Sequence, residues 1–165
     1  MMSKVEFVPF LLTETTDIFS IRINGDRMTE LEKFLIMFKD SENKYVQSDL
    51  ESIIKAISNI SENGALESYF RPEGKFNDRV VALPIYVVSR NKKAEGTLRL
   101  YGIRISNSLL IIGGGGLKTT QAYEQDEVLR EHVERLQKID GVLSGLSSEG
   151  LAIQDAIYNL TVEID

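Results

Sequence analysis

The stretch TLRLYGIRISNSLLIIGGGGLKTT, residues 97–120, decides the fold of this chain. Apolar and β-branched residues run on both sides of a short Ser-Asn-Ser turn at residues 106–108, so each half reads as a strand. Two strands joined by so short a turn pair as an antiparallel hairpin. The sequence therefore predicts a hairpin at the centre of a sheet.

The first strand of this hairpin carries cations among its apolar residues. Burying a cation without a partner costs free energy, so Arg99 and Arg104 are expected at an edge, a cleft or an acceptor. A cleft in which Arg99, Tyr101 and Lys118 converge would suit a phosphate or a carboxylate. Strict alternation puts Arg104 on the opposite face, and it joins the others only if Gly102 marks a bulge or a bend.

These cations also have ordinary interpretations, which the sequence leaves open. The arginines could pair with nearby carboxylates, and exposed pairs of that kind contribute little energy. At the end of the second strand, Lys118, Thr119 and Thr120 fit a solvated strand end as well as an anion-binding role. The carboxylates considered as partners are Glu73, Glu124 and Asp126.

The glycine run at residues 113–116 invites comparison with a phosphate-binding loop. The Walker pattern needs glycine directly before lysine and a helix starting there, whereas Leu117 separates Gly116 from Lys118. The run instead predicts a bulge, or a strand end that another backbone approaches closely.

Composition bounds the class of protein. With 165 residues, 42% of them apolar and 27% charged, the chain reads as one globular domain over residues 1–165. It has no cysteine, which excludes disulfides, thiolate nucleophiles and zinc–thiolate sites. The net charge of −6 argues against nucleic-acid binding over a broad surface, so a basic site would have to be local. No apolar stretch approaches the roughly 18 residues of a membrane span, and we expect a cytoplasmic protein that binds no membrane.

The remaining periodicities predict helices that are grouped together instead of alternating with strands. This grouping favours an α+β domain with an antiparallel sheet, two helices before the central hairpin and a C-terminal helix. One helix begins at a capping box at residues 48–51 and stops at Asn63-Gly64. The other expected segments are strands at residues 4–12, 18–23 and 79–88 and helices at residues 29–39, 126–144 and 151–160.

The only histidine, His132, lies in the predicted helix at residues 126–144. Between charged neighbours it reads more readily as a solvated side chain than as a catalytic one, although histidine titrates near neutral pH. Without a second histidine or a thiol, the common metal and nucleophile constellations cannot be assembled. We therefore expect no metal and no cofactor.

The order of elements and the hairpin resemble the RelE/ParE/HigB toxin superfamily, and most closely its phage-derived, HigB-like members. That family has a strand, two helices and an antiparallel hairpin sheet, with an arginine-and-tyrosine strand and a Lys-Lys-Thr-like element. The matching stretches here are residues 98–101 and 117–120, and residues 71–75 stand where the family has a basic loop. The resemblance covers about residues 30–136, with a C-terminal helical tail at about residues 145–165 outside it.

The resemblance implies a toxin of a toxin–antitoxin pair that cleaves messenger RNA, usually on the ribosome, without a metal. It makes Arg99 and Lys118 phosphate clamps, with Arg104 as a third clamp if the strand bends. The acid–base candidates are Tyr101 and Tyr123, either of which could instead pack or stack on a base. It adds anion-binding residues in the loop and beyond the second strand, namely Arg71, Lys75, Thr119, Thr120 and Tyr123.

Two departures from the family stand against catalysis. The typical toxin is small and basic, whereas this chain is longer and acidic, and Leu117 replaces the first lysine of the family element. Two other functions therefore stay open. One is a catalytically silent relative that binds a protein, and the other is an enzyme acting on a small anionic ligand.

Overall fold

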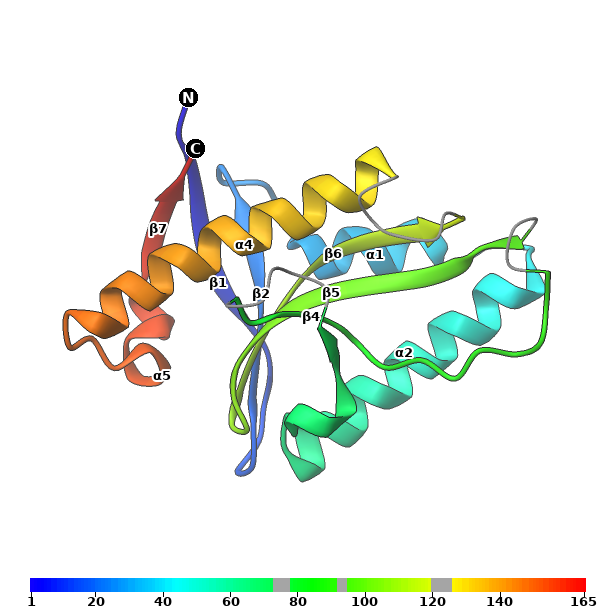
Figure 1. Ribbon diagram of the computed structural model, residues 1–165, viewed down its shortest axis with the longest axis horizontal. Helices are drawn as coiled ribbons and strands as arrows, with labels where there is room; N and C mark the ends of the chain where they lie inside the picture. Colours follow the sequence, from blue (N-terminus) through cyan, green and yellow to red (C-terminus); the bar gives the residue numbers. More distant parts are fainter. Residues whose placement is uncertain (73–77, 92–94, 120–125) are drawn as a thin grey trace.

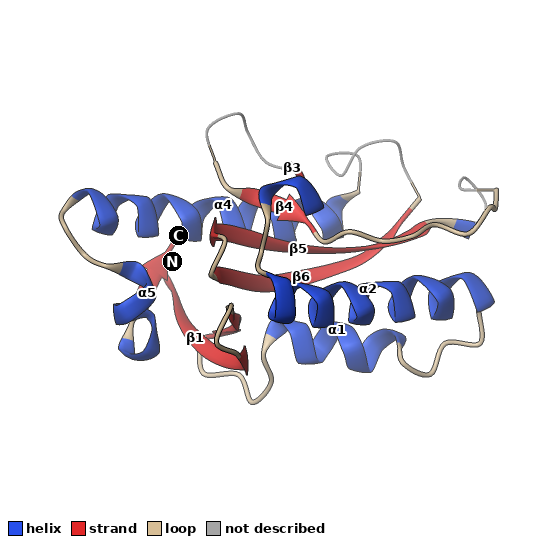
Figure 2. Ribbon diagram, turned by 90° about the horizontal axis from the view of Figure 1, so that it is seen from below, coloured by secondary structure: helices blue, strands red, loops and turns tan. Residues whose placement is uncertain are grey.

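The structure is a computed structural model that describes residues 1–72, 78–91, 95–119 and 126–165. Over these residues the strands form one seven-stranded sheet in the order β3-β4-β5-β6-β2-β1-β7. The central hairpin is β5 and β6, as the sequence predicts. Helices α1 and α2 lie on one side of the sheet and α4 crosses the other (Figures 1 and 2).

The bounds of the elements follow the predicted order with several differences. The strands are β1 (Ser3–Leu12), β2 (Asp17–Ile23), β3 (Arg71–Pro72), β4 (Val80–Ala82), β5 (Thr97–Ser106), β6 (Leu109–Lys118) and β7 (Thr161–Ile164). The helices are α1 (Glu30–Phe38), α2 (Lys44–Asn63), α4 (Glu127–Ser148) and α5 (Ile153–Ala156), with 3-10 turns η1 (Glu67–Tyr69) and η3 (Ile157–Asn159). The α+β class is confirmed.

The prediction of a purely antiparallel sheet is wrong, because β2 and β6 pair in parallel. After β2 the chain passes through α1 and α2 and then through β4 and β5 before it returns as β6 beside β2. A parallel pairing needs such a long crossover connection, and the helix pair supplies it. The sheet is therefore mixed, with antiparallel pairings elsewhere along it.

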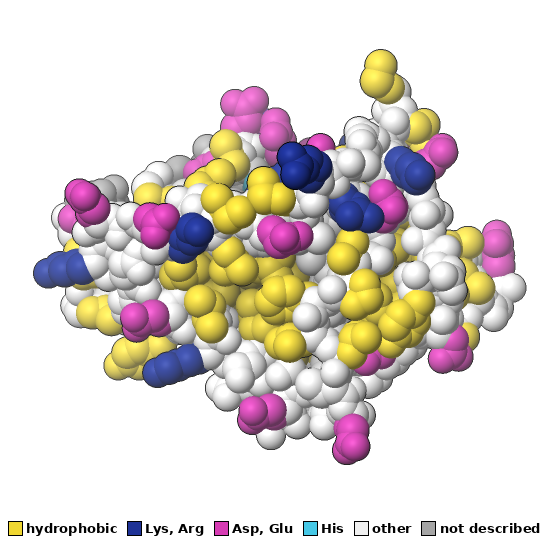
Figure 3. All heavy atoms as spheres, turned by 180° about the vertical axis from the view of Figure 1, so that it is seen from behind, with side chains coloured by type: hydrophobic (Ala, Val, Ile, Leu, Met, Phe, Trp, Pro, Cys, Tyr) yellow, Lys and Arg dark blue, Asp and Glu magenta, His cyan; other side chains and the backbone are white. Residues whose placement is uncertain are grey.

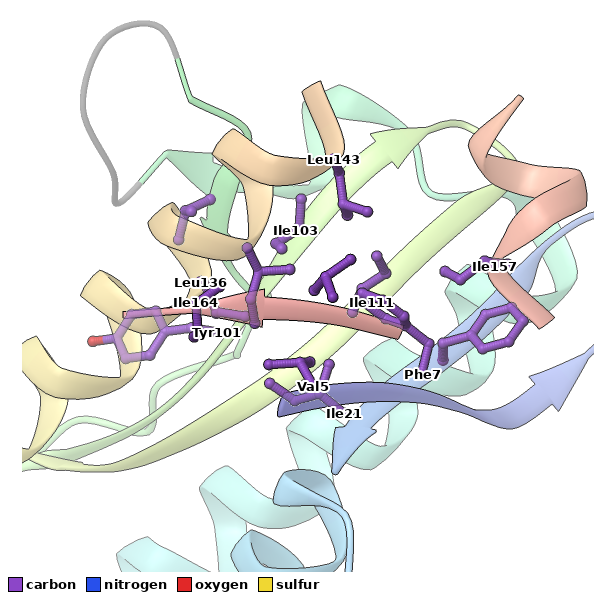
Figure 4. Packing of buried hydrophobic residues seen from close by; sticks show 14 of the residues in the cluster. Val5, Phe7, Ile21, Tyr101, Ile103, Ile111, Leu136, Leu143, Ile157 and Ile164 are labelled. Atoms are coloured by element: carbon purple, nitrogen blue, oxygen red, sulfur yellow. The ribbon is translucent and has the colours of Figure 1, made fainter. Parts of the chain in front are cut away.

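Two apolar cores lie on the two faces of the sheet. The core beneath α4 holds buried residues of that helix together with Tyr101, Ile103 and Ile111 (Figure 4). The core on the other face lies between α1, α2 and the sheet, and includes Leu98, Leu100 and residues of α2. The hairpin is thus buried from both sides, which accounts for its continuous apolar sequence.

Helix α2 begins earlier than the predicted capping box. Its N-cap is Asn43, whose side-chain oxygen accepts hydrogen bonds from the N–H groups of Tyr45 and Val46, so Ser48 is inside the helix. The predicted stop is confirmed, because Gly64 has a φ of 101° and its N–H donates to Ile60. Helix α1, in contrast, starts at a capping box in which the Thr29 hydroxyl accepts from the Glu32 N–H and the Glu32 carboxylate accepts from the Thr29 N–H.

The predicted strand at residues 79–88 is much shorter, since β4 ends at Ala82. Proline removes a ladder donor, and Pro84 follows the last backbone bond to β5, which Leu83 donates to Leu100. Beyond that point residues 83–91 run along α2 (Figure 1), and we call them the connecting segment.

The C-terminal region differs from the expected helical tail. Helix α4 continues through Gly141 as far as Ser148, four residues beyond its predicted end. Only the short α5 and η3 follow, and the chain then ends in β7, which pairs antiparallel with β1. The C-terminal segment therefore completes one edge of the sheet.

Candidate functional site

A β-bulge interrupts the pairing of β5 with β6. Leu100 is opposite Gly115, whereas Gly102 is opposite Ile112, so Gly113 and Gly114 together face Tyr101. One extra residue on one strand is the defining feature of such a bulge. The predicted bulge in the glycine run is confirmed.

Helix α4 packs directly on the backbone of this glycine run. A β-carbon at Gly113 would come within 2.8 Å of Leu136, and one at Gly114 within 2.5 Å of the His132 ring. Real β-carbons do not approach neighbours so closely. The glycines let α4 lie close to β6, in line with the predicted close approach to the glycine run.

Three of the predicted site residues face the same side of the sheet. Tyr101 belongs to the core beneath α4, and Arg99 points to the same side because it lies two residues away on the same strand. Opposite Arg99 is Gly116, where an added β-carbon would lie 3.3 Å from Leu129 of α4, and Lys118 lies two residues further on. The structure therefore brings Arg99, Tyr101 and Lys118 to the α4 side of the hairpin.

These three residues differ in burial and therefore in their access to a ligand. Tyr101 is 0% exposed and Lys118 is 8% exposed, whereas Arg99 is half-buried. All three make further interactions with the rest of the chain. Tyr101 thus packs in the core, where a macromolecular substrate does not reach it.

Arg104 lies on the opposite face, as strict alternation predicts. Its Nε donates to the carbonyl oxygen of Ala65 at 2.7 Å, and its guanidinium also donates to the Asn107 side chain. The bulge lies in β6, so the alternation of β5 continues through Gly102 and Ile103 remains in the core beneath α4. Arg104 joins the turn of the hairpin to the end of α2, apart from Arg99.

The remaining predicted anion-binding residues do not lie together. Arg71 is opposite Ala82, which is opposite Tyr101, so Arg71 stands on the α4 side at the exposed β3 edge. Thr119 is exposed directly after β6. Lys75, Thr120 and Tyr123 lie outside the described residues.

His132 is half-buried on α4, in contrast to the predicted solvated position. Its ring lies against Gly114, and within the described residues its Nδ1 has no hydrogen-bond partner. Burial lowers the pKa of the imidazole, and the positive charge of Arg135 lowers it further. Arg135 is itself held at 2.6 Å by the buried carboxylate of Glu30 on α1.

On the α2 face, sequence reasoning missed a buried ion pair. Asp49 of α2 and Arg90 of the connecting segment form a two-pronged pair with both bonds at 2.7 Å, and both side chains are 0% exposed. Asp49 also accepts the N–H of Leu98, and the Arg90 guanidinium lies over the Tyr45 ring. The partners are 41 residues apart, so no local pattern announces the pair.

Beside this pair is a pocket of about 560 Å³ between α2 and the connecting segment. It is lined by Ser52, Lys55, Ala56, Asn59, Ile60, Asn63, Tyr69, Pro84, Ile85 and Tyr86. The sequence gives no periodic signal for it, because its two walls come from separate parts of the chain.

Among the described residues, no group of three or more histidine or acidic side chains is arranged to hold a metal ion. None of the described helices has the length and apolar character of a membrane span. No protein-family model, curated protein or solved structure matches this chain.

Proposed function

We propose that the protein is a toxin-like component of a toxin–antitoxin pair that binds RNA phosphates through the open end of the β5–β6 hairpin. The observation that carries the proposal is the common orientation of Arg99 and Lys118 on neighbouring strands. Half-buried Arg99 is the more accessible of the two cations, since Lys118 is 8% exposed. Thr119 adds an exposed hydroxyl directly beyond Lys118. Cations and hydroxyls near the end of a hairpin suit phosphate oxygens.

The order of elements supports the proposal. From β2 onward the chain runs through α1 and α2 into the strands β4, β5 and β6, followed by α4. A strand, two helices and an antiparallel hairpin sheet is the order that the RelE/ParE/HigB resemblance implies. The order alone specifies no chemistry, so the proposal depends on the two cations.

The burial of Tyr101 argues for binding in preference to cleavage by that residue. A general acid must come within about 2.6–3.2 Å of the group that it protonates. Tyr101 is 0% exposed beneath α4, so it does not meet this requirement. RNA cleavage, if it occurs, therefore uses another acid–base group.

The test is inducible expression in a bacterial host. Wild type is expected to arrest growth, and the double substitution Arg99→Ala/Lys118→Ala to abolish the arrest at equal soluble protein. The matched control is Arg27→Ala/Lys39→Ala, which likewise removes one arginine and one lysine, but from exposed positions elsewhere in the chain. Circular dichroism of both purified variants checks that the fold is retained.

Arrest that persists in a folded Arg99→Ala/Lys118→Ala variant would contradict the proposed site. Absence of arrest with abundant, folded wild type would contradict a toxin-like activity. In that case the silent protein-binding relative becomes the better interpretation.

One observation favours that second candidate specifically. Large apolar side chains stay exposed on α1, including Ile36 at 51% and Met37 at 68%, and Ile54 on α2 is also exposed. Hydrophobic side chains gather in a broad patch on the rear of the molecule (Figure 3). Extended exposed apolar patches often mark interaction surfaces. Met37→Glu is therefore expected to weaken the binding of a protein partner and to leave an RNA-dependent growth arrest unchanged.

A further inference from the structure

The pocket between α2 and the connecting segment combines an apolar floor with a polar rim. Its floor contains Ala56 and Ile60 of α2 and Pro84 and Ile85 of the connecting segment. Its volume of about 560 Å³ is that of a small-molecule site. It lies on the α2 face, across the sheet from Arg99 and Lys118.

The wall formed by the connecting segment is anchored to α2 at two points. The N–H of Tyr86 donates to Ser52 Oγ at 2.6 Å, and the buried Arg90–Asp49 pair anchors the segment further along. The segment runs antiparallel to α2, because residues 84–86 lie beside its second half and Arg90 beside its start. An anchored wall reduces the entropy that a ligand must remove on binding.

One row of polar side chains lines the helix side of the pocket. Lys55, Asn59 and Asn63 follow at intervals of four residues and therefore share one face of α2. Within the described residues the side chains of these three make no hydrogen bond or ion pair with the chain. The pocket lining contains this one lysine and no carboxylate, so its charge suits an anionic ligand.

Two tyrosines stand at the rim. Tyr69 follows α2 and is 38% exposed, and Tyr86 on the connecting segment is 80% exposed. An exposed aromatic ring is a platform on which a nucleobase stacks with little sequence preference. Asparagine amides both donate and accept hydrogen bonds, which suits the polar edge of a base.

We propose that this pocket binds a nucleotide unit, with the base stacked on Tyr86, its edge on Asn59 and Asn63, and its phosphate near Lys55. A free mononucleotide and one residue of a single-stranded RNA present this same chemistry. The site is separate from the proposed phosphate site on the α4 side and does not depend on it.

The test is a titration of the full-length protein followed by amide chemical shifts. The ligands are adenosine 5′-monophosphate, uridine 5′-monophosphate, inorganic phosphate and an eight-nucleotide single-stranded RNA. Saturable shifts are expected for residues of α2 and the connecting segment with a nucleotide or with the RNA. Tyr86→Ala is expected to raise the dissociation constant about tenfold, in line with the energy of base stacking.

The matched control is Tyr158→Ala, which removes another exposed tyrosine, 46% exposed, outside the pocket lining. It should leave the titration unchanged, and Asn59→Ala should weaken binding without loss of fold. If the protein binds the RNA but neither mononucleotide, the ligand of the pocket is single-stranded RNA. If it binds a mononucleotide but not the RNA, the ligand is a free nucleotide.

Three results would overturn the inference. These are the absence of saturable shifts with every ligand up to millimolar concentration, equal binding of inorganic phosphate and nucleotide, and a titration that is insensitive to Tyr86→Ala. Arg99→Ala/Lys118→Ala should leave this titration intact, so its outcome is distinguishable from that of the growth assay.

Discussion

The two faces of the β5–β6 hairpin bury the same strands by different means. Beneath α4, glycines replace side chains and the helix rests on the backbone of β6. On the α2 face, large apolar side chains fill the space, and a buried Arg90–Asp49 pair joins the connecting segment to α2. The comparison teaches that α4 can rest on β6 because glycines leave room for it, whereas the connecting segment is held on α2 by a specific charge pair.

The largest expected effect is on the charge pair. Asp49→Ala leaves the buried Arg90 without its carboxylate and removes the acceptor for Leu98 N–H. Loss of one partner of a buried pair typically costs about 3–5 kcal/mol, and we expect a loss of that size in the free energy of unfolding measured with urea. The control is Glu6→Ala, which breaks the partly exposed pair with Arg22 and should cost about 1 kcal/mol or less. Equal losses in the two variants would contradict the larger contribution assigned to the buried pair.

Next in size is the effect of added volume under α4. Gly114→Ala places a methyl group against the His132 ring, and relief of the clash requires α4 or the ring to move. We expect a cost of about 1–3 kcal/mol in the same assay, as for other overpacked interiors. The matched control is Gly141→Ala within α4, where the added carbon meets nothing within 4 Å beyond the neighbouring backbone of the helix itself. That variant should gain about 0.5–1 kcal/mol from helix propensity, so the two substitutions should have opposite signs.

A smaller effect distinguishes the observed start of α2 from the start that the sequence predicts. Asn43→Ala removes the acceptor for two N–H groups of the first turn and should cost about 1 kcal/mol. Ser48→Ala, at the predicted cap, lies inside the helix and should be neutral or slightly stabilising. Thermal unfolding of both variants checks the assignment, and a larger loss at Ser48 would reverse it.

The smallest expected effect is a pH dependence carried by His132. Burial lowers the pKa of the imidazole below its ordinary value of 6.5, and the positive charges of Arg135 and Lys33 lower it further. The negative charges of Glu30 and Glu131 raise this pKa and so offset part of the shift. As the pH falls below 6.5, the unfolded chain takes up the proton before the folded chain, so stability falls. The loss levels off once the pH passes below the folded-state pKa.

His132→Gln should therefore lose less stability than wild type between pH 7.5 and pH 5.5 in urea unfolding. Because His132 is the only histidine, the difference between the two proteins isolates its contribution. Parallel pH profiles would mean that the imidazole titrates alike in both states.

Much of the local structure was predictable from the sequence, because it depends on neighbours along the chain. The hairpin, the capped start of α1, the stop at Gly64 and the long helix after Asp126 all follow from short-range patterns. The candidate site was predictable in part, since strand alternation alone places Arg99 and Arg104 on opposite sides, whereas the side of Lys118 depends on the pairing register of β5 with β6.

The errors fall where distant segments compete with local preference. The box at residues 48–51 has a capping sequence, yet α2 begins at Lys44 with Asn43 as its N-cap, and its first turn buries Val46 in the core on that face. Residues 79–88 have strand composition, yet after Leu83 they leave the sheet and run along α2. Neither the anchoring pair nor the pocket could be anticipated, because each joins segments that are tens of residues apart.

The sequence by itself determined the α+β class, the central hairpin, the bounds of α1, the stop of α2, the start of α4 and the exclusion of cysteine chemistry, since each depends on composition or on contacts a few residues apart. Only the tertiary structure decided that β2 and β6 run parallel, that α4 closes over the glycine run and that Tyr101 is buried. It also decided that Asp49 meets Arg90 beside an open pocket. The physical reason is that burial and charge pairing depend on which distant surfaces meet, and local residue patterns do not specify those meetings.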